Sequence, residues 1–302
     1  NRGKEDIALF SDTVKKKKKK FPQKGFVEVP TQDRLSILAA CEDPKTVATF
    51  NYGHNIWPLP QTGQMWLEYE LLKQPELSGV FCVSTSFRNE PNPIPGRHKI
   101  LFPMFEFEAK GTMGDLRVLE ESLLVHMGFG QPSDFIHKSY DELAGYYGTE
   151  ELSSAHENKM KPDFGNVVFL ERFPQRTSPF WNMKKDGDYS NKIDVIINGQ
   201  ETIGSAERST NPEEMRELFH AISDGQYAQT LYGLFGKERV EKELEEFLSL
   251  SFFPRFGGGI GMTRLMSAMA DKSAQAVKVL EKIKKRNLTL VANNKYILTN
   301  DK

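Results

Sequence analysis

The sequence lacks a cysteine framework, a long apolar run and an excess of charge of either sign. Two cysteines, Cys41 and Cys82, occur among its 302 residues, which is too few for a disulfide framework, and their spacing matches no zinc site. We expect both to be reduced, buried thiols. No segment approaches the roughly 18 consecutive apolar residues of a membrane helix, and no secretory signal follows Asn1. These absences predict a cytoplasmic protein that does not enter membranes.

The charges of the chain nearly balance. Forty Lys and Arg residues face 41 Asp and Glu residues, so the formal net charge is −1. No global basic field therefore indicates nucleic-acid binding. Hydrophobic residues make up 38% and charged residues 27% of the chain, which is typical of a folded globular protein with one large domain or two small ones.

One dense block of charge is a run of six lysines at residues 15–20. Like charges this close repel one another, so we do not expect a stable helix made of them alone. We favour a solvated flexible segment or the exposed end of an amphipathic helix. Contact with RNA phosphates is the second possibility.

The pattern of apolar residues predicts a mixed α+β fold with antiparallel strand pairs instead of repeated β-α-β units. Residues 63–74 have near-helical spacing, while residues 79–87 and 99–108 alternate and are joined by a polar link with three prolines. Further strands are expected at 26–29, 167–172, 192–197 and near Phe252. Further helices are expected at 116–127, 140–145, 212–224, 237–248 and 262–270, with a basic helix at 276–286 and a possible strand at 288–298.

The hairpin expected over residues 79–108 gathers cations, carboxylates and an aromatic side chain. An arginine at a strand end offers a planar fork to a phosphate or carboxylate, a phenylalanine offers a platform to a purine, and a carboxylate accepts from an amine. These are the parts of a site for ATP and an amino acid, although surface ion pairs on a hairpin would give the same residues. The residues concerned are Arg88, Glu90, Arg97, His98, Phe102 and Glu106.

A second feature is the glycine cluster at residues 257–261, with Arg264 at the start of the expected helix that follows. Glycines let a backbone approach a ligand or a neighbouring strand closely. The cluster fits neither a Walker nor a Rossmann pattern, so alone it is weak evidence for a phosphate site.

A third feature is the pair Asp194 and Glu201, which flank the preferred tight-turn dipeptide Asn198-Gly199. Two carboxylates that face each other across a hairpin suit Mg²⁺ bound together with substrate phosphates. Solvated turn flanks are the ordinary alternative for such residues.

Taken in this order, the three features resemble the motifs of class II aminoacyl-tRNA synthetases. Residues 87–106 look like motif 2, residues 257–264 look like motif 3, and residues 173–181 with 194–208 are similar to the asparaginyl and aspartyl branch. Motif 1 is weaker, because Pro30 precedes Thr31 instead of following it. The resemblance implies an antiparallel sheet flanked by helices, with a catalytic domain at 26–272, an N-terminal extension at 1–25 and a basic C-terminal helix and tail at 273–302.

The resemblance also implies roles in binding ATP, which would be a substrate. Arg88 would hold the α-phosphate and the amino-acid carboxylate, and Arg264 would be its catalytic partner. Phe102 and Arg264 would enclose the adenine ring, and Glu90 would receive the adenine amino group. The remaining nucleotide contacts are expected from Arg97, His98, Glu201 and Gly261.

For the metal and the amino acid, the resemblance implies a second set of roles. Asp194 and Glu201 would carry Mg²⁺, Glu106 would receive the substrate α-ammonium, and Arg208 would meet the side-chain oxygen. The expected amino-acid site consists of Gln64, Glu68, Arg88, Glu106 and Arg208.

The segment at residues 61–68 bears on the choice of substrate. Aspartate users of this family have a lysine where this chain has Leu67, while Glu68 and the order Thr62-Gly63-Gln64 are similar to asparaginyl enzymes. Asparagine is therefore the first expectation and aspartate the second. Leu67 could also simply pack into a helix core, and Leu101 and Phe256 stand where the family usually has other residues.

Three functions stay open at this stage. The first is an asparaginyl-type ligase, the second is an ammonia-dependent asparagine synthetase acting on aspartate, and the third is a non-catalytic regulator that kept the fold. About 25 residues precede motif 1, which are too few for the usual anticodon-binding domain, so tRNA is a possible partner without anticodon recognition. By resemblance, we expect a homodimer formed through the motif 1 region.

Overall fold

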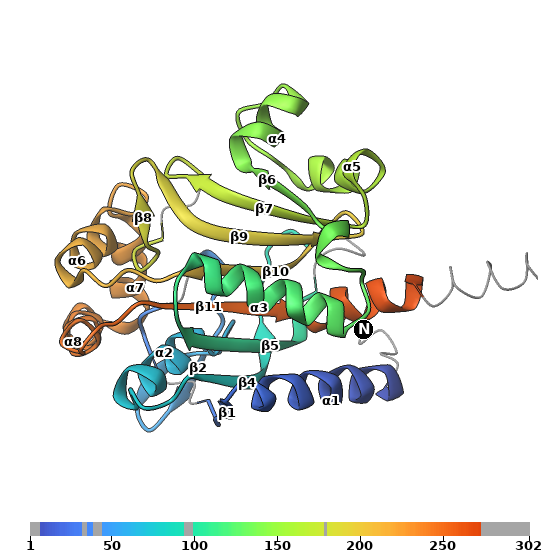
Figure 1. Cartoon of the computed structure of the whole chain (residues 1–302). Helices are drawn as coiled ribbons and strands as arrows, with labels where there is room; N and C mark the ends of the chain where they lie inside the picture. The colour runs from blue at the N-terminus through green and yellow to red at the C-terminus, as the bar shows by residue number, and fades with distance from the viewer. Residues whose placement is uncertain (1–6, 32–34, 39–43, 94–98, 178–179, 273–302) are drawn as a thin grey trace, which may run out of the picture.

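A computed structural model describes residues 7–31, 35–38, 44–93, 99–177 and 180–272. Its centre is a sheet of nine strands in the order β1-β4-β5-β11-β10-β9-β7-β6, with β8 paired to β9. The β1–β4 and β6–β7 pairs are parallel and the other pairs are antiparallel. The expected α+β fold with a mainly antiparallel sheet and flanking helices is thus confirmed (Figure 1).

The strands of this sheet come from the whole length of the chain. The first half supplies β1 (Phe26–Glu28), β4 (Gly79–Phe87), β5 (Leu101–Lys110) and β6 (Ile136–Ser139). The second half supplies β7 (Val167–Pro174), β8 (Lys185–Asp186), β9 (Tyr189–Ile197), β10 (Gln200–Glu207) and β11 (Arg255–Gly261). A separate hairpin is formed by β2 (Thr49–Tyr52) and β3 (Asn55–Pro58). The strand expected near Phe252 begins three residues later, at Arg255.

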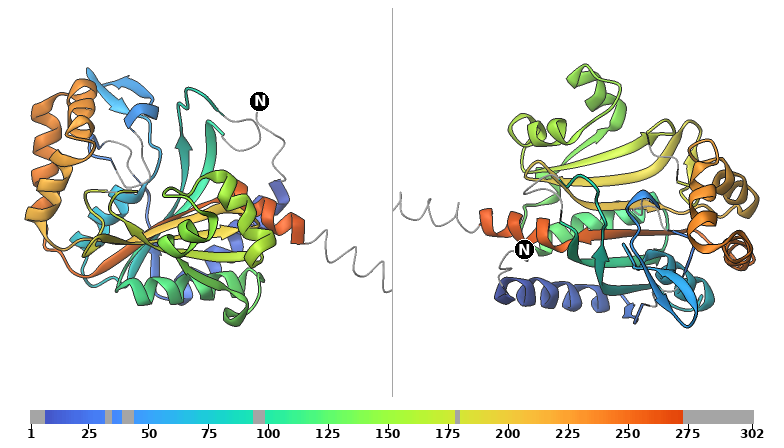
Figure 2. Two further views of the ribbon diagram at one scale, coloured as in Figure 1. Left: turned by 90° about the horizontal axis from the view of Figure 1, so that it is seen from above. Right: turned by 180° about the vertical axis from the view of Figure 1, so that it is seen from behind.

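Helices cover both faces of the sheet. The α-helices are α1 (Ile7–Gln23), α2 (Gln64–Lys73), α3 (Met113–His126), α4 (Tyr140–Tyr147), α5 (Ser154–Phe164), α6 (Pro212–Ala221), α7 (Gln226–Phe235) and α8 (Lys237–Leu248), and a last helix begins at Met262. Two short 3-10 turns lie at Pro44–Thr46 and Pro132–Asp134. Helix α3 lies on one face and the β2–β3 hairpin on the other (Figures 1 and 2). Within the described residues no helix is long and apolar enough to cross a membrane.

Three apolar clusters fix these layers. Phenylalanines and aliphatic residues of α1, α3 and the helix after β11 pack on one face of the sheet. Helices α2, α6, α7 and α8 enclose a second cluster around Trp181. A third cluster joins α4 and α5 to β7 and β9. At roughly 25 cal/mol per Å² of buried apolar surface, such clusters supply the main stabilising term of the fold.

The lysine run lies in a regular helix, α1, which agrees with the expected amphipathic helix and not with the expected flexible segment. Phe10, Val14 and Phe21 of α1 pack into the same core as the sheet, and that apolar stripe compensates for the repulsion between the lysines. Lys17 is fully buried. The boundary expected at residue 25 therefore falls between two elements that share one core. The helix and strand expected within residues 273–302 lie outside the described residues.

Candidate active site

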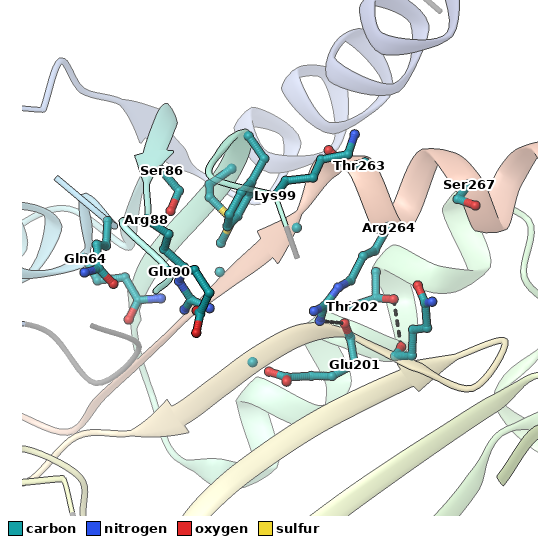
Figure 3. Close-up of a pocket in the computed structure, with 17 residues that line it drawn as sticks. Gln64, Ser86, Arg88, Glu90, Lys99, Glu201, Thr202, Thr263, Arg264 and Ser267 are labelled. Atoms are coloured by element: carbon teal, nitrogen blue, oxygen red, sulfur yellow. Dashed lines mark hydrogen bonds between the residues drawn. The ribbon is translucent and has the colours of Figure 1, made fainter. Parts of the chain in front are cut away.

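A cavity of about 290 Å³ opens beside the glycine strand β11, in the centre of the sheet. Its walls come from the β4–β5 hairpin, the start of β10 and the helix that follows β11 (Figure 3). The lining residues are Gln61, Gln64, Ser86, Arg88, Glu90, Lys99, Phe102, Met104, Gln200, Glu201, Thr202, Gly204, Gly259, Gly261, Thr263, Arg264 and Ser267.

The structure brings seven of the predicted site residues into this cavity. The backbone N–H of Arg88 donates to the Ile100 carbonyl (2.9 Å), which closes the hairpin next to the cavity. On the opposite side, Arg264 Nη1 donates to the Glu201 carbonyl oxygen (2.5 Å). The seven residues are Gln64, Arg88, Glu90, Phe102, Glu201, Gly261 and Arg264.

The glycines of β11 are required by the residues that face them. A Cβ added at Gly257 would lie 1.7 Å from a carboxylate oxygen of Glu108, and one at Gly259 would lie 2.9 Å from the Met104 methyl group. Either side chain would collide with its neighbours or fill the floor of the cavity. The glycine cluster thus keeps this part of the sheet open to a ligand.

Asp194 and Glu201 converge above Gly204. A Cβ at Gly204 would lie 3.0 Å from Glu201 Oε1 and 3.6 Å from Asp194 Oδ1, so the glycine leaves the space between the carboxylates free. Asp194 Oδ1 is buried and has no hydrogen-bond partner in the described structure, whereas Asp194 Oδ2 accepts from Lys192 Nζ (2.8 Å). Burial raises the pKa of Asp194, Lys192 opposes this effect, and Glu201 adds to it. The pair can therefore offer oxygens to a hard cation.

A buried network of charges lies behind the cavity. Arg208 Nη2 donates to Glu108 Oε1 (2.5 Å) and to Gln64 Oε1 (3.0 Å). Arg255 Nη2 donates to Glu68 Oε2 (2.6 Å), and Glu68 Oε1 lies 3.6 Å from Arg208 Nε. The four charged side chains are at most 2% exposed. The network thus pairs two arginines with two glutamates. Gln64, which accepts from Arg208 and lines the cavity, connects the network to the cavity.

Sequence reasoning assigned no role to Glu108 or Arg255. Glu108 lies two positions beyond Glu106 on the same strand, so it shares the face of Glu106, and this spacing could have drawn attention to it. Arg255 has no comparable signal, because its contact with Glu68 joins segments 187 residues apart.

Glu106 lies beneath the entrance to α2, away from the cavity lining. Its carboxylate accepts from the backbone N–H of Gly63 (2.8 Å) and from the hydroxyls of Thr62 and Ser84. The side chain is fully buried, and burial raises its pKa although these hydrogen bonds oppose the shift. Glu106 thus holds the loop that carries Gln61 and Gln64.

Other predicted residues stand apart from the cavity. Leu67 is fully buried and packs with Leu71, Val80 and Cys82, so it belongs to the core between α2 and β4. Cys82 is a buried thiol, as expected, and its Sγ lies 3.8 Å from Glu106 Oε2. Arg97, His98 and Cys41 lie outside the described residues.

The chain matches the family model of class II tRNA synthetases of the D, K and N type over residues 1–279. It is 30% identical over 110 residues to an aspartate–tRNA(Asp) ligase of Pyrobaculum aerophilum, a match to 35% of this chain and 22% of that protein. It is also 25% identical over 284 residues to the cytoplasmic aspartate–tRNA ligase of Mus musculus, a match to 80% of this chain and 53% of that protein.

Among solved structures, the fold is similar to that of an asparaginyl-tRNA synthetase from Pyrococcus horikoshii in complex with asparaginyl-adenylate. The TM-score is 0.70 at 20% identity, and the match covers 87% of this chain and 64% of that chain. The chain therefore spans about half the length of its mouse relative and shares the fold of the archaeal enzyme. Because the family model matches residues 1–279 of the 302-residue chain, the chain belongs to the class II tRNA synthetases of the aspartate, lysine and asparagine group.

Proposed function

We propose that the chain activates an amino acid with ATP and forms an aminoacyl-adenylate. The observation that carries this proposal is the cavity itself, which Arg88 and Glu90 enter from one wall and Arg264 from another (Figure 3). Phe102 is also part of its lining. Two guanidinium groups suit phosphate and carboxylate oxygens. An aromatic ring with a nearby carboxylate suits a purine with an amino group.

In the proposed reaction, a carboxylate oxygen of the amino acid attacks the α-phosphorus of ATP. A new bond joins that oxygen to phosphorus, and the bond from the α-phosphorus to the bridging oxygen breaks, so pyrophosphate leaves with its electron pair. The protein contributes no nucleophile. Arg88 holds the two reacting groups together and Arg264 stabilises the phosphoryl charge, so catalysis comes from positioning and electrostatics.

Mg²⁺ fits the pair Asp194 and Glu201. Both supply the oxygen donors that magnesium prefers, and the buried Asp194 Oδ1 faces the open space above Gly204. In the described residues, no group of three or more His, Cys, Asp or Glu side chains could hold a metal alone, so phosphate oxygens would complete the coordination. When bound, the ion would neutralise phosphate charge.

Asparagine is the proposed amino acid, because the buried network behind Gln64 has no net charge when both glutamates are ionised. Burial raises the pKa of Glu108 to about 7, although Arg208 opposes the shift, so this balance is reached above about pH 7. A neutral amide side chain adds no charge to that balance, whereas the carboxylate of aspartate would need a further cation there. Leu67 packs in the core and does not line the cavity. Aspartate remains the second candidate, with ammonia as the group that would attack the aspartyl-adenylate.

The group that accepts the activated amino acid is proposed from family membership. A tRNA is the first candidate and ammonia is the second. We further propose a cytoplasmic location and a homodimer.

Amino-acid-dependent exchange between ATP and labelled pyrophosphate tests the proposal. We expect exchange with asparagine, and we expect Arg88→Ala to reduce it at least 1000-fold, because this residue holds both reacting groups. Arg176→Ala, which alters a surface arginine paired with Asp141, should leave the rate unchanged.

The same assay separates the alternatives. Exchange with aspartate followed by ammonia-dependent release of asparagine would identify the second function. An absence of exchange with every amino acid, in a chain that binds ATP, would identify a non-catalytic regulator. An unchanged rate in Arg88→Ala would overturn the role of Arg88.

A further inference from the structure

The strand that carries Glu201 has an irregularity at this residue. Glu201 pairs with Ile196 of β9, and Ile203 pairs with the next residue, Val195, so Thr202 is the extra residue of a β-bulge. A bulge re-aims the side chains beside it and leaves local backbone groups without strand partners. The direction of the Glu201 carboxylate therefore depends on what holds this backbone.

Two side chains from other elements hold the backbone of Glu201. Glu157 Oε2, from α5, accepts from the Glu201 backbone N–H (3.1 Å). Arg264 Nη1 donates to the Glu201 carbonyl oxygen (2.5 Å), which is the contact drawn in Figure 3. The residue is thus fixed from both sides, and the contact with Glu157 comes from outside the cavity lining.

Helix α5 packs closely against the turn between β9 and β10, which fixes the position of Glu157. Gly199, in the turn between β9 and β10, has a φ of +82°. A Cβ at Gly199 would lie 3.1 Å from Asn158 Cα and 3.2 Å from the carbonyl oxygen of Glu157. A glycine is needed there both for the backbone conformation and for the close approach. The turn thereby seats α5 against the strand that carries Glu201.

We propose that Glu157 is a positioning residue, which aims the Glu201 carboxylate at the metal that accompanies ATP by holding the Glu201 backbone N–H. The inference rests on the proposed function, because it concerns the same metal pair. It assigns to α5, which lies outside the three recognised motifs, a part in building the site. Residues that orient metal ligands typically change metal affinity or activity 10–100-fold when they are replaced.

The test is the binding of Mn²⁺ to the full chain in the presence of α,β-methylene-ATP, followed by electron paramagnetic resonance of the free ion. Glu157→Ala removes the acceptor, and we expect at least 10-fold weaker binding of Mn²⁺. Glu157→Gln keeps an oxygen that accepts from the same N–H, so its affinity should stay within about 3-fold of the wild type. Glu150→Ala, on the exposed segment between α4 and α5, is the matched control.

A second readout separates positioning from a loss of fold. In pyrophosphate exchange, Glu157→Ala should raise the Mg²⁺ concentration for half-maximal rate while the KM for asparagine stays nearly constant. A general loss of structure would change both and would lower the thermal unfolding temperature.

The outcomes are distinct for the two proposals. If the wild type shows neither nucleotide-dependent Mn²⁺ binding nor exchange, the proposed function is overturned, and the role of Glu157 with it. If the wild type binds Mn²⁺ and Glu157→Ala binds it equally well, only the role of Glu157 is overturned. If Glu157→Gln is as weak as Glu157→Ala, the charge of Glu157 matters and the hydrogen bond does not, which also overturns the proposal.

Discussion

At the scale of single residues, buried charges distinguish this site from a generic nucleotide pocket. Arg208 contacts Glu108 and the cavity-lining Gln64 at once. Its charge is therefore already balanced when a substrate side chain arrives. Because buried charges are costly when unpaired, a change of one member should alter which substrate charge the pocket tolerates.

Replacing Glu108 with glutamine should shift the preference from asparagine toward aspartate. Glutamine still accepts from Arg208, but the four-residue network gains a net positive charge. We expect the ratio of kcat/KM for aspartate to that for asparagine to rise about 10-fold, which corresponds to ~1.4 kcal/mol. Exchange assays with each amino acid at pH 8 measure the ratio.

The control for this experiment is Glu121→Gln, which alters a glutamate of α3 that pairs with His137. A ratio that does not move in Glu108→Gln would show that the network does not sense the substrate side chain. Gln64 would then be the remaining contact with it.

At the scale of elements, helix α1 buries one stripe of residues in the core although it contains the lysine run. Thr13, Lys17 and Phe21 are fully buried at intervals of four residues, which is one stripe of a helix. Lys17 Nζ lies 2.7 Å from Met262 Sδ and 5.0 Å from the centre of the Phe105 ring. Met262 and Phe105 are neighbours of Gly261 and Met104, which line the cavity.

Lys17→Met should stabilise the chain at pH 7, because it removes a buried amine whose charged form is disfavoured by desolvation. Burial lowers the pKa of Lys17 well below its ordinary value of 10.5, so the unfolded chain binds this proton more tightly than the folded chain. The stability of the wild type should therefore rise with pH between the lowered folded pKa and about 10.5. Urea unfolding at several pH values measures this slope.

In Lys17→Met this rise should be absent, because neither state binds the proton. Lys19→Met, at an exposed position of the same helix, should keep it. Equal stability of the wild type and Lys17→Met across this pH range would show that the amine reaches water or an anion.

At the scale of the whole molecule, the β1 edge of the sheet bears on assembly. β1 has three residues and pairs only with β4 among the described strands. It follows α1, whose exposed lysines include Lys15, Lys18 and Lys19. Because a two-fold contact places identical surfaces together, a dimer through this region would bring these lysines near their copies.

We therefore expect a dimer that salt strengthens. Light scattering should report twice the chain mass of 34.4 kDa, with a larger dimer fraction at 0.5 M than at 0.05 M salt, because salt screens the like charges. A monomer at every salt concentration would contradict the dimer. A dimer insensitive to salt would place the contact away from α1.

Much of the fold follows from local patterns in the sequence. Period-2 alternation predicted β4 and β5, and the near-helical spacing of apolar residues predicted α2 and α8. Of the two expectations for the lysine run, the amphipathic helix agrees with the structure, although Lys17 is buried. The helix forms because the burial of Phe10, Val14 and Phe21 on the sheet outweighs the local repulsion.

The sequence alone determined the motifs, and with them the residues that meet around the cavity. The grouping of Arg88, Phe102 and Arg264 was implied by the resemblance to class II synthetases, and the three residues line one cavity. Tertiary structure alone decided which charged groups line the cavity and which pair with one another. Glu106 holds a loop and Arg208 faces Glu108 because strands distant in sequence are brought into contact, and the pairing of buried charges depends on such contacts and not on local sequence.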